Sequence, residues 1–243
     1  MTTRTNISVL ILGANSDVAK ECILLYTAKG YNVMAASRST EQLEDFVTRY
    51  NLTRQVYVLY FDATDFDSHR KFYEQLPSKP TIVLYAAGFL KDNEEALVDW
   101  HGSYQMMKVH YCGAVSILNL AATDPGNPHL KKIIGLSSLS GVRGRKSNFI
   151  YGSTKSAFTQ YLAGLRQYLF PRKIEVNVIV AGYIRSKMTE GLDLTESLML
   201  EPSFIAQAVV NAKKQLIIVP GLKWKIIYHI LRVLPERIVA RLP

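Results

Sequence analysis

The chain has 243 residues, of which 48% are hydrophobic and 20% are charged. This length and this apolar fraction suffice for one domain with a sizeable core, and they exclude a disordered chain. The 29 Lys and Arg residues exceed the 20 Asp and Glu residues, so the net charge is +9. That balance favours a solvated basic surface, an anionic ligand, an anionic membrane surface or, as the weakest of these, nucleic acid, for which no binding motif is present.

The sequence also indicates the cellular compartment in which the protein resides. The two cysteines, Cys22 and Cys112, are too few for a disulfide framework and favour a reducing environment. No uncharged apolar stretch approaches the roughly 18 residues that a membrane span needs. Residues 1–13 hold one Arg and a short apolar run, which we interpret as a buried strand and not as a secretory leader. These features predict a cytoplasmic protein.

Short apolar runs alternate with longer amphipathic segments along the chain. Most runs are continuously apolar, which is typical of strands buried on both faces. Strands joined by helical crossovers predict an α/β fold with a doubly wound parallel (Rossmann) sheet of seven strands flanked by helices. We expect one domain over residues 1–222 and a basic tail over residues 223–243. The expected strands are residues 7–12, 32–37, 56–61, 81–87, 132–138, 176–182 and 215–221.

Ligands of such a sheet bind at the carboxyl ends of its strands. After the first strand, Gly13 suits a tight turn, and Asn15 and Ser16 suit the start of a helix whose free N–H groups favour an anion. A dinucleotide fingerprint has three glycines, but Asp17 and Ala19 stand at the second and third places. The pattern therefore fits a dinucleotide site and an ordinary strand-to-helix turn equally. Asp17 would repel a pyrophosphate, so we expect its side chain to point away or to cap the helix.

The ends of the next three strands carry further candidates. Arg38 follows the second strand, where an acid would bind the ribose of NAD and an Arg would bind the 2′-phosphate of NADP. Because no carboxylate occurs until Glu41, we favour NADP(H) over NAD(H), the alternative being a surface Arg at a helix start. Asp62 lies beside an adenine amino group or caps a helix. The small residues 86–88 let a flat cofactor lie against the backbone.

The most specific pattern follows the fifth strand. Tyr151 and Lys155 are four residues apart and share one face of a helix, and Ser138 stands thirteen residues before Tyr151 at the end of the strand. A phenol has a pKa of about 10, and a nearby ammonium lowers that pKa. Tyr151 can then donate a proton to a carbonyl oxygen or take one from an alcohol, while Ser138 hydrogen-bonds the same oxygen.

With these residues the sequence resembles the short-chain dehydrogenase/reductase family over nearly the whole chain, from residue 13 to at least residue 188. The resemblance implies that Ser138, Tyr151 and Lys155 are catalytic and that Lys155 also binds the nicotinamide ribose. It further implies a homo-oligomer, a dimer or a tetramer, and a catalytic site without a metal.

The resemblance extends the cofactor site beyond the sixth strand. The Pro-Gly motif of the family is Ala181-Gly182 here, Ile184 follows at the place whose backbone contacts the nicotinamide amide, and Ser186 stands where a Thr is usual. The expected cofactor-binding residues are thus Gly13, Asn15, Ser16, Asp17, Val18, Ser37, Arg38, Asp62, Ala63, Ala86, Ala87, Gly88, Tyr151, Lys155, Gly182, Ile184 and Ser186.

The chain departs from the family pattern on two further elements. The usual Asn-Asn-Ala-Gly is Tyr-Ala-Ala-Gly at residues 85–88, and the catalytic Asn of the long central helix aligns with His110. That Asn supports a water-linked proton relay to the Lys of the family. His110 either replaces it as a proton shuttle, since imidazole both donates and accepts, or is a packed, hydrogen-bonded histidine with no role in the reaction.

Three stretches together are similar to a narrower bacterial group, the decaprenylphosphoryl-2-keto-ribose reductases: residues 144–158, residues 181–194 and residues 223–242. Members of that group reduce a keto-sugar carried on a polyprenyl phosphate and so form an arabinose donor for cell-wall glycans. The resemblance implies a keto-sugar substrate in the biosynthesis of an envelope polysaccharide, but it does not identify the sugar.

The tail, residues 223–243, holds five basic residues and one acidic residue. Its helical periodicity gives an apolar face and a polar strip, and Pro235 should end or kink the helix. A basic amphipathic helix that carries Trp can lie on an anionic membrane, and the alternative is packing on its own domain or across a dimer interface. The expected apolar face is Trp224, Ile227, Ile230, Leu231 and Leu234, and the expected polar strip is Lys225, His229 and Arg232.

The sequence hence predicts an NADPH-dependent oxidoreductase that transfers a hydride to a ketone, with Tyr151 supplying the proton. The favoured substrate is a keto-sugar, small or lipid-linked, met in the cytoplasm or at the inner face of the membrane. One alternative is an enzyme of the same family acting on a small ketone, alcohol or acyl thioester. Another is a non-catalytic NADP-binding sensor, which the incomplete glycine motif and His110 favour and the Ser, Tyr and Lys oppose.

Overall fold

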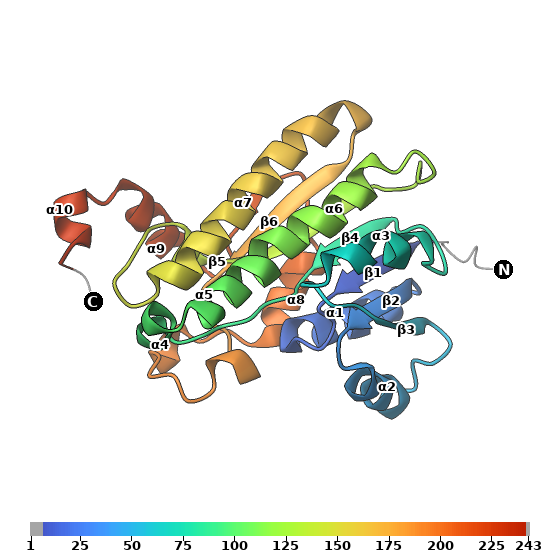
Figure 1. Ribbon diagram of the computed structural model, residues 1–243, viewed down its shortest axis with the longest axis horizontal. Coiled ribbons are helices and arrows are strands. Elements are labelled where there is room, and N and C mark those ends of the chain that lie inside the picture. The colour runs from blue at the N-terminus through green and yellow to red at the C-terminus, as the bar shows by residue number, and fades with distance from the viewer. Residues whose placement is uncertain (1–6, 242–243) are drawn as a thin grey trace.

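The computed structural model describes residues 7–241 and places seven parallel strands in one sheet of order β3-β2-β1-β4-β5-β6-β7 (Figure 1). The order reverses between β1 and β4, and the strand ends flanking such a reversal form the crevice where ligands of this architecture bind. The strands are β1 Ser8–Leu12, β2 Asn32–Ser37, β3 Val56–Tyr60, β4 Ile82–Tyr85, β5 Lys132–Ser138, β6 Glu175–Ala181 and β7 Ile217–Ile218.

Helices cover both faces of the sheet (Figure 1), as its continuously apolar strands require. One face packs against α1, α2 and α8, and the other packs against α3, α6, α7 and α9. The helices are α1 Asp17–Ala28, α2 Thr40–Arg49, α3 Phe66–Glu74, α4 Asn93–Val98, α5 Trp100–Met107, α6 Gly113–Thr123, α7 Phe149–Leu169, α8 Pro202–Val210, α9 Leu222–Val233 and α10 Glu236–Val239.

The prediction of a doubly wound seven-stranded sheet is confirmed. Its weakest element is the last strand, which we expected over residues 215–221 but which pairs only at Ile217 and Ile218. The helix of the tail ends before Pro235, as its fixed φ and missing N–H require. Residues 1–6, part of the stretch on which we based the absence of a leader, and residues 242–243 of the tail lie outside the described residues.

A π-helical turn, Lys108–Cys112, interrupts the long helical segment between α5 and α6. Such turns widen a helix by one residue and often mark functional sites. Gly113 follows it, where a Cβ would lie 2.1 Å from the carbonyl oxygen of Ala63, so only glycine allows α6 to approach the end of β3 this closely. Within residues 7–241 no helix has the length and apolar character needed to cross a membrane.

Candidate active site

A cleft opens at the carboxyl ends of β1 to β6, at the crevice where the strand order reverses. Sixteen of the expected cofactor residues line it, all of them except Gly182. Six further lining residues were not predicted. They are Phe61, Val109, Leu136, Ser137, Lys187 and Met188.

The turn after β1 has the geometry of a phosphate-binding turn. Gly13 has φ +84°, and a Cβ there would lie 2.4 Å from the backbone nitrogen of Ala87, so glycine alone fits. Ser16 caps α1 by accepting the N–H of Ala19 at 3.2 Å, which leaves the positive helix N-terminus directed at the cleft. Asn15 donates to the Ser37 hydroxyl at 3.0 Å, while its own buried Oδ1 has no hydrogen-bond partner. An unpaired acceptor beside a helix N-terminus fits a polar ligand such as a dinucleotide.

Asp17 occupies the place of the second glycine and turns its carboxylate away from the turn. Its Oδ2 accepts the backbone N–H of Lys187 at 2.9 Å. The carboxylate thus ties the segment after β6 to the first turn of α1, across the cleft that both residues line. Our expectation that Asp17 points away from a bound pyrophosphate agrees with this contact.

Arg38 and Asp62 line the outer end of the cleft. The guanidinium of Arg38 is exposed and has no ion pair within the described part of the chain. Asp62 accepts the backbone N–H of Thr64 at 2.8 Å and the Thr64 hydroxyl at 2.9 Å. Asp62 therefore closes a turn before α3 and faces the cleft, whereas Asp65 is the N-cap of α3. The helix-cap alternative is wrong, and the contact with adenine stays a prediction.

Two glycines bring the end of β5 against the start of α7. A Cβ at Gly152 would lie 2.5 Å from the carbonyl oxygen of Ser140, and one at Gly141 would lie 2.7 Å from the backbone nitrogen of Ser156. This close approach brings Ser138, which ends β5 and accepts the N–H of Ser140 at 3.2 Å, beside the first turn of α7. The sequence pattern pointed to the reactive residues but not to the two glycines that bring them together.

Tyr151 and Lys155 line the cleft from consecutive turns of α7. The ammonium of Lys155 donates to the carbonyl oxygen of Leu136 at 3.1 Å and lies 5.7 Å from the centre of the Tyr151 ring. The lysine side chain is thus held by the end of β5, on the face of the helix from which the phenol also projects.

The pKa of Tyr151 corrects our expectation. Burial raises the pKa of this phenol to about 12, against an opposing effect of the neighbouring Ser138 hydroxyl. Burial also lowers the pKa of the Lys155 ammonium to about 8. We expected the ammonium to make the phenol more acidic, but the loss of solvation sets the direction of the shift, and Lys155 is not among its causes. At neutral pH the phenol therefore keeps its proton, which is the form that donates.

His110 is buried in the π-helical turn, and both of its ring nitrogens are engaged. Nε2 accepts the backbone N–H of Phe89 at 3.0 Å, so the neutral ring carries its proton on Nδ1. Nδ1 donates to the Thr154 hydroxyl at 2.7 Å, and this hydroxyl donates to the carbonyl oxygen of Tyr151 at 2.7 Å. Burial, together with the charge of Lys155, holds the pKa of His110 well below its ordinary value. The ring joins the end of β4 to the first turn of α7 and does not line the cleft.

Tyr85, the departure from the family's Asn at the end of β4, supports the same turn. It is fully buried, its hydroxyl donates to the carbonyl oxygen of Val109, and its ring packs against Phe158 of α7. With the contact between Phe89 and His110, this bond makes two links from the end of β4 to the π-helical turn. Tyr85 and His110, which both depart from the family pattern, thus both connect the end of β4 to the π-helical turn.

The segment between β6 and α8 forms one wall of the cleft. Ile184 and Ser186 line the cleft, and Met188 lies 3.2 Å from the position that a Cβ of Gly88 would take. Gly182 instead faces α9, where a Cβ would lie 2.0 Å from the ring of Trp224. The structure therefore gives Gly182 a packing role that sequence reasoning missed.

No group of three or more His, Cys, Asp or Glu side chains within the described residues is arranged to hold a metal ion. Tyr151 and Lys155 line the cleft together with Asn15 and Arg38, whereas Ser138 does not line it but lies beside the Tyr151 hydroxyl. A phenol that can donate a proton, next to a turn that can bind an anion, is compatible with acid–base chemistry beside a bound dinucleotide.

Comparisons with known proteins agree with this arrangement. A family model described as short chain dehydrogenase matches residues 8–197. The chain is 27% identical to an uncharacterized oxidoreductase of Mycobacterium tuberculosis over 97% of this chain and 96% of that protein. It also resembles a short chain dehydrogenase of Burkholderia cenocepacia solved with NADP, with TM-score 0.83 and 18% identity over 98% of this chain and 97% of that one. The NADP-bound protein ElxO matches with TM-score 0.76 and 17% identity, over 89% and 97% of the two chains.

Proposed function

The chain belongs to the short chain dehydrogenase family and is an NAD(P)-dependent oxidoreductase, and we propose that it reduces a ketone to an alcohol with NADPH. The observation that carries this proposal is the buried Tyr151 phenol, which keeps its proton at neutral pH and lines the cleft one helical turn from Lys155. A protonated phenol is an acid that can donate to a carbonyl oxygen as that oxygen gains charge.

Ser138, Tyr151 and Lys155 would each have a separate role in the reaction. Ser138 would hydrogen-bond the carbonyl oxygen of the substrate and hold it near the phenol, and Tyr151 would donate its proton to that oxygen. Lys155 would bind the ribose next to the reacting ring and stabilise the phenolate left after transfer. The nicotinamide supplies the hydride when it is bound.

The preference for NADPH rests on the outer end of the cleft. Arg38 leaves β2 at the place where the adenosine ribose binds in this architecture, and its guanidinium has no competing carboxylate partner within residues 7–241. A guanidinium there is available to the 2′-phosphate. The NADP complexes among the similar solved structures support the same preference.

For the substrate we propose a keto-sugar, carried on a polyprenyl phosphate and used for an envelope polysaccharide. The support is the sequence resemblance of residues 144–158, 181–194 and 223–242 to decaprenylphosphoryl-2-keto-ribose reductases. These stretches contain the start of α7, part of the segment between β6 and α8 that forms one wall of the cleft, and α9 with α10. Such a substrate would be met at the cytoplasmic face of a membrane.

The oligomeric state is also a proposal. Trp100 and Tyr104 stack on the outer face of α5, with ring centres 5.8 Å apart, and Tyr111 lies exposed on the adjoining π-helical turn. Aromatic side chains are enriched at protein interfaces. We propose that this face pairs with a second copy of the chain.

The decisive experiment compares wild type with Tyr151→Phe, supplied with NADPH and a panel of ketones that includes free and lipid-linked keto-pentoses. We expect the variant to bind NADPH as wild type does and to lose at least about 100-fold in kcat, since the general acid is missing. Activity within a few-fold of wild type would exclude the proposed role of Tyr151. Turnover of small ketones or acyl thioesters alone would overturn the keto-sugar substrate, and NADPH binding without any turnover would indicate a sensor.

A further inference from the structure

The helix α9 has two apolar faces, and only one of them is buried. Trp224 and Leu231 are buried against the core, with Ile227 partly buried beside them. The side chains of Leu222, Ile226, Ile230 and Val233, which we call the outer ridge, are 48% to 79% exposed. Their spacing of four, four and three residues places them on one face of the helix. This corrects the expected apolar face, because Ile230 belongs to the outer ridge and not to the face that packs on the domain.

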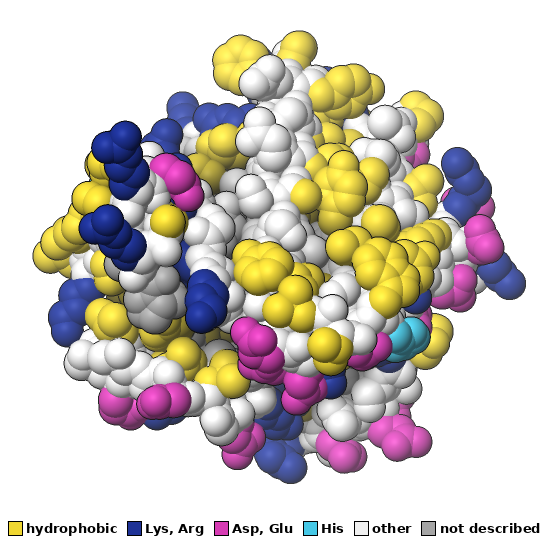
Figure 2. Space-filling model, turned by 60° about the vertical axis from the view of Figure 1, so that its left-hand side comes forward, with side chains coloured by type: hydrophobic (Ala, Val, Ile, Leu, Met, Phe, Trp, Pro, Cys, Tyr) yellow, Lys and Arg dark blue, Asp and Glu magenta, His cyan; other side chains and the backbone are white. Residues whose placement is uncertain are grey.

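A strip of basic side chains runs along one side of the outer ridge. It consists of Lys225, His229 and Arg232, all exposed and spaced four and three residues apart. Arg237 and Arg241 continue the basic character along the chain. Figure 2 shows dark blue and yellow side chains intermixed on its left-hand side, where α9 and α10 come forward.

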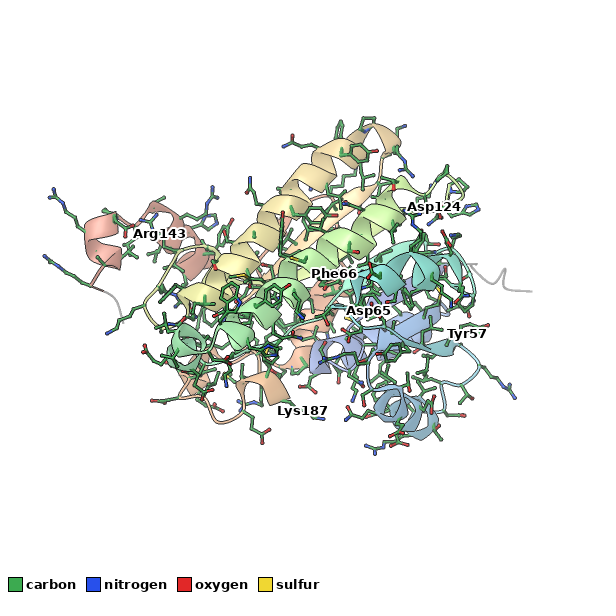
Figure 3. All side chains as sticks on the ribbon, viewed as in Figure 1. Tyr57, Asp65, Phe66, Asp124, Arg143 and Lys187 are labelled. Atoms are coloured by element: carbon green, nitrogen blue, oxygen red, sulfur yellow. The ribbon has the colours of Figure 1, made fainter. Side chains whose placement is uncertain are left out.

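The stretch of chain that holds α9 and α10 carries almost no acidic side chain to offset its positive charge. Between residues 202 and 241 the one acidic residue is Glu236. Its carboxylate accepts a hydrogen bond from Arg143 at 2.6 Å, and Arg143 lies beside the C-terminal helices (Figure 3). Glu236 is therefore already paired with a cation from outside the tail, and the outer surface of α9 stays basic.

We propose that the outer ridge and the basic strip of α9 dock the protein on an anionic lipid bilayer. An apolar ridge flanked by cations matches a membrane interface, where acyl chains cover the ridge and lipid headgroups bind the cations. Pairing of α9 with a second copy fits less well. It would bring two basic strips together without an acid to compensate them, and like charges across an interface are unfavourable.

The buried face of α9 connects this docking surface to the cleft. The indole N–H of Trp224 donates to the carbonyl oxygen of Leu198 at 2.9 Å, and the ammonium of Lys223 donates to that of Ser197 at 3.1 Å. Both acceptors lie on the segment between β6 and α8 that walls the cleft. A bilayer bound by the outer ridge would therefore be separated from the wall of the active site by the helix α9. The docking surface goes beyond the proposed reaction, because lipid binding does not depend on which ketone is reduced.

The test is co-sedimentation of the full chain with vesicles of phosphatidylcholine alone or mixed with phosphatidylglycerol. We expect binding to the mixed vesicles that falls as salt rises. The double variant Ile226→Ser/Ile230→Ser removes the centre of the outer ridge and should weaken binding by about tenfold or more. Lys225→Gln/Arg232→Gln removes two cations and should weaken it by about 30-fold.

Matched controls keep the result specific. Tyr57→Ser/Tyr60→Ser removes two exposed side chains of the edge strand β3, and Tyr57 lies at the end of the molecule away from α9 (Figure 3). This variant should bind vesicles as wild type does. Each variant is checked for folding by NADPH-induced thermal stabilisation.

Two results would overturn the proposal. In the first, the folded wild-type protein does not bind the vesicles that contain phosphatidylglycerol. In the second, the ridge variant changes a dimer to a monomer in light scattering without changing vesicle binding, so that a second copy covers the ridge. Loss of vesicle binding with unchanged reduction of a soluble ketone would support the docking surface independently of the Tyr151 test.

Discussion

His110 offers the sharpest test of how this active site departs from its family. The structure favours a positioning role, because both ring nitrogens are already engaged by Phe89 and Thr154. Replacement by Ala would leave the partly buried N–H of Phe89 without its acceptor, would remove one of the two hydrogen bonds of the buried Thr154 hydroxyl, and would open a cavity. Each unpaired buried group costs about 1–3 kcal/mol. We therefore expect His110→Ala to lower the free energy of unfolding by about 3 kcal/mol or more, and His110→Asn, whose amide oxygen can accept the N–H of Phe89, to lower it by much less.

The pH dependence of stability isolates the same ring. His110 is held neutral in the fold, whereas in the unfolded chain its pKa is about 6.5. As pH falls below that value the unfolded chain gains a proton that the folded protein does not bind, so stability is lost. From pH 6.5 to pH 5 this loss is at most about 2 kcal/mol, the amount for a ring that binds no proton in the folded protein. Urea unfolding should show this loss in wild type and a loss smaller by this amount in His110→Asn.

The kinetic assay separates positioning from proton transfer. If His110 only positions Tyr151 through Thr154, kcat of wild type and of His110→Asn should have the same pH profile between pH 5 and pH 8, because the imidazole then takes no part in proton transfer. A limb in the wild-type profile that disappears in a stably folded His110→Asn variant would refute the positioning role. Such a limb would make His110 the proton shuttle that the sequence also allowed.

Two further substitutions test the cleft and its wall. Arg38→Asp should weaken NADPH binding about 10- to 100-fold and leave NADH binding nearly unchanged, because the 2′-phosphate loses a charged hydrogen bond. The control Arg54→Asp, outside the cleft, should leave the affinities for both cofactors unchanged. Equal losses of NADPH and NADH affinity in calorimetry would contradict the assignment of Arg38 to the 2′-phosphate. Gly182→Ala drives a methyl group into the Trp224 ring and should lower the free energy of unfolding by about 1–3 kcal/mol. Gly164→Ala, with open space around it, is its control, and equal thermal stability of the two variants would show that Trp224 yields at no cost.

The fold was predictable because its dominant signal is local. A strand buried on both faces must be apolar at every position, so the runs that became β1, β2, β5 and β6 are visible without any tertiary information. The last strand shows the limit of this reasoning. Residues 215–221 look as apolar as the others, but only Ile217 and Ile218 pair, and the length of an edge strand depends on what its single neighbour offers.

The reactive residues were predictable, and the contacts that set their chemistry were not. The spacing of Tyr151 and Lys155 places both on one helix face whatever surrounds them. The pKa of Tyr151 depends on burial, which the sequence does not display, and burial reversed the expected direction of its shift. The packing of Gly182 on Trp224 joins residues far apart in the chain, so a family motif suggested cofactor contact where the structure has a helix.

The pKa values of Tyr151 and Lys155 are shifted in opposite directions, and both shifts affect proton transfer in the cleft. Reduction needs a protonated phenol, and burial holds the pKa of Tyr151 at about 12, so the acid form is ready at neutral pH. Oxidation would need the phenolate, which the same burial disfavours. Lys155, with a pKa of about 8, is mostly protonated at neutral pH and gradually loses its charge in alkali, which would remove the cation that stabilises the phenolate after proton transfer. The Tyr151 shift therefore maintains at neutral pH the acid form that proton donation uses, whereas the Lys155 shift limits the charge available to stabilise the phenolate, and both shifts follow from one cause, the burial of these side chains at the start of α7.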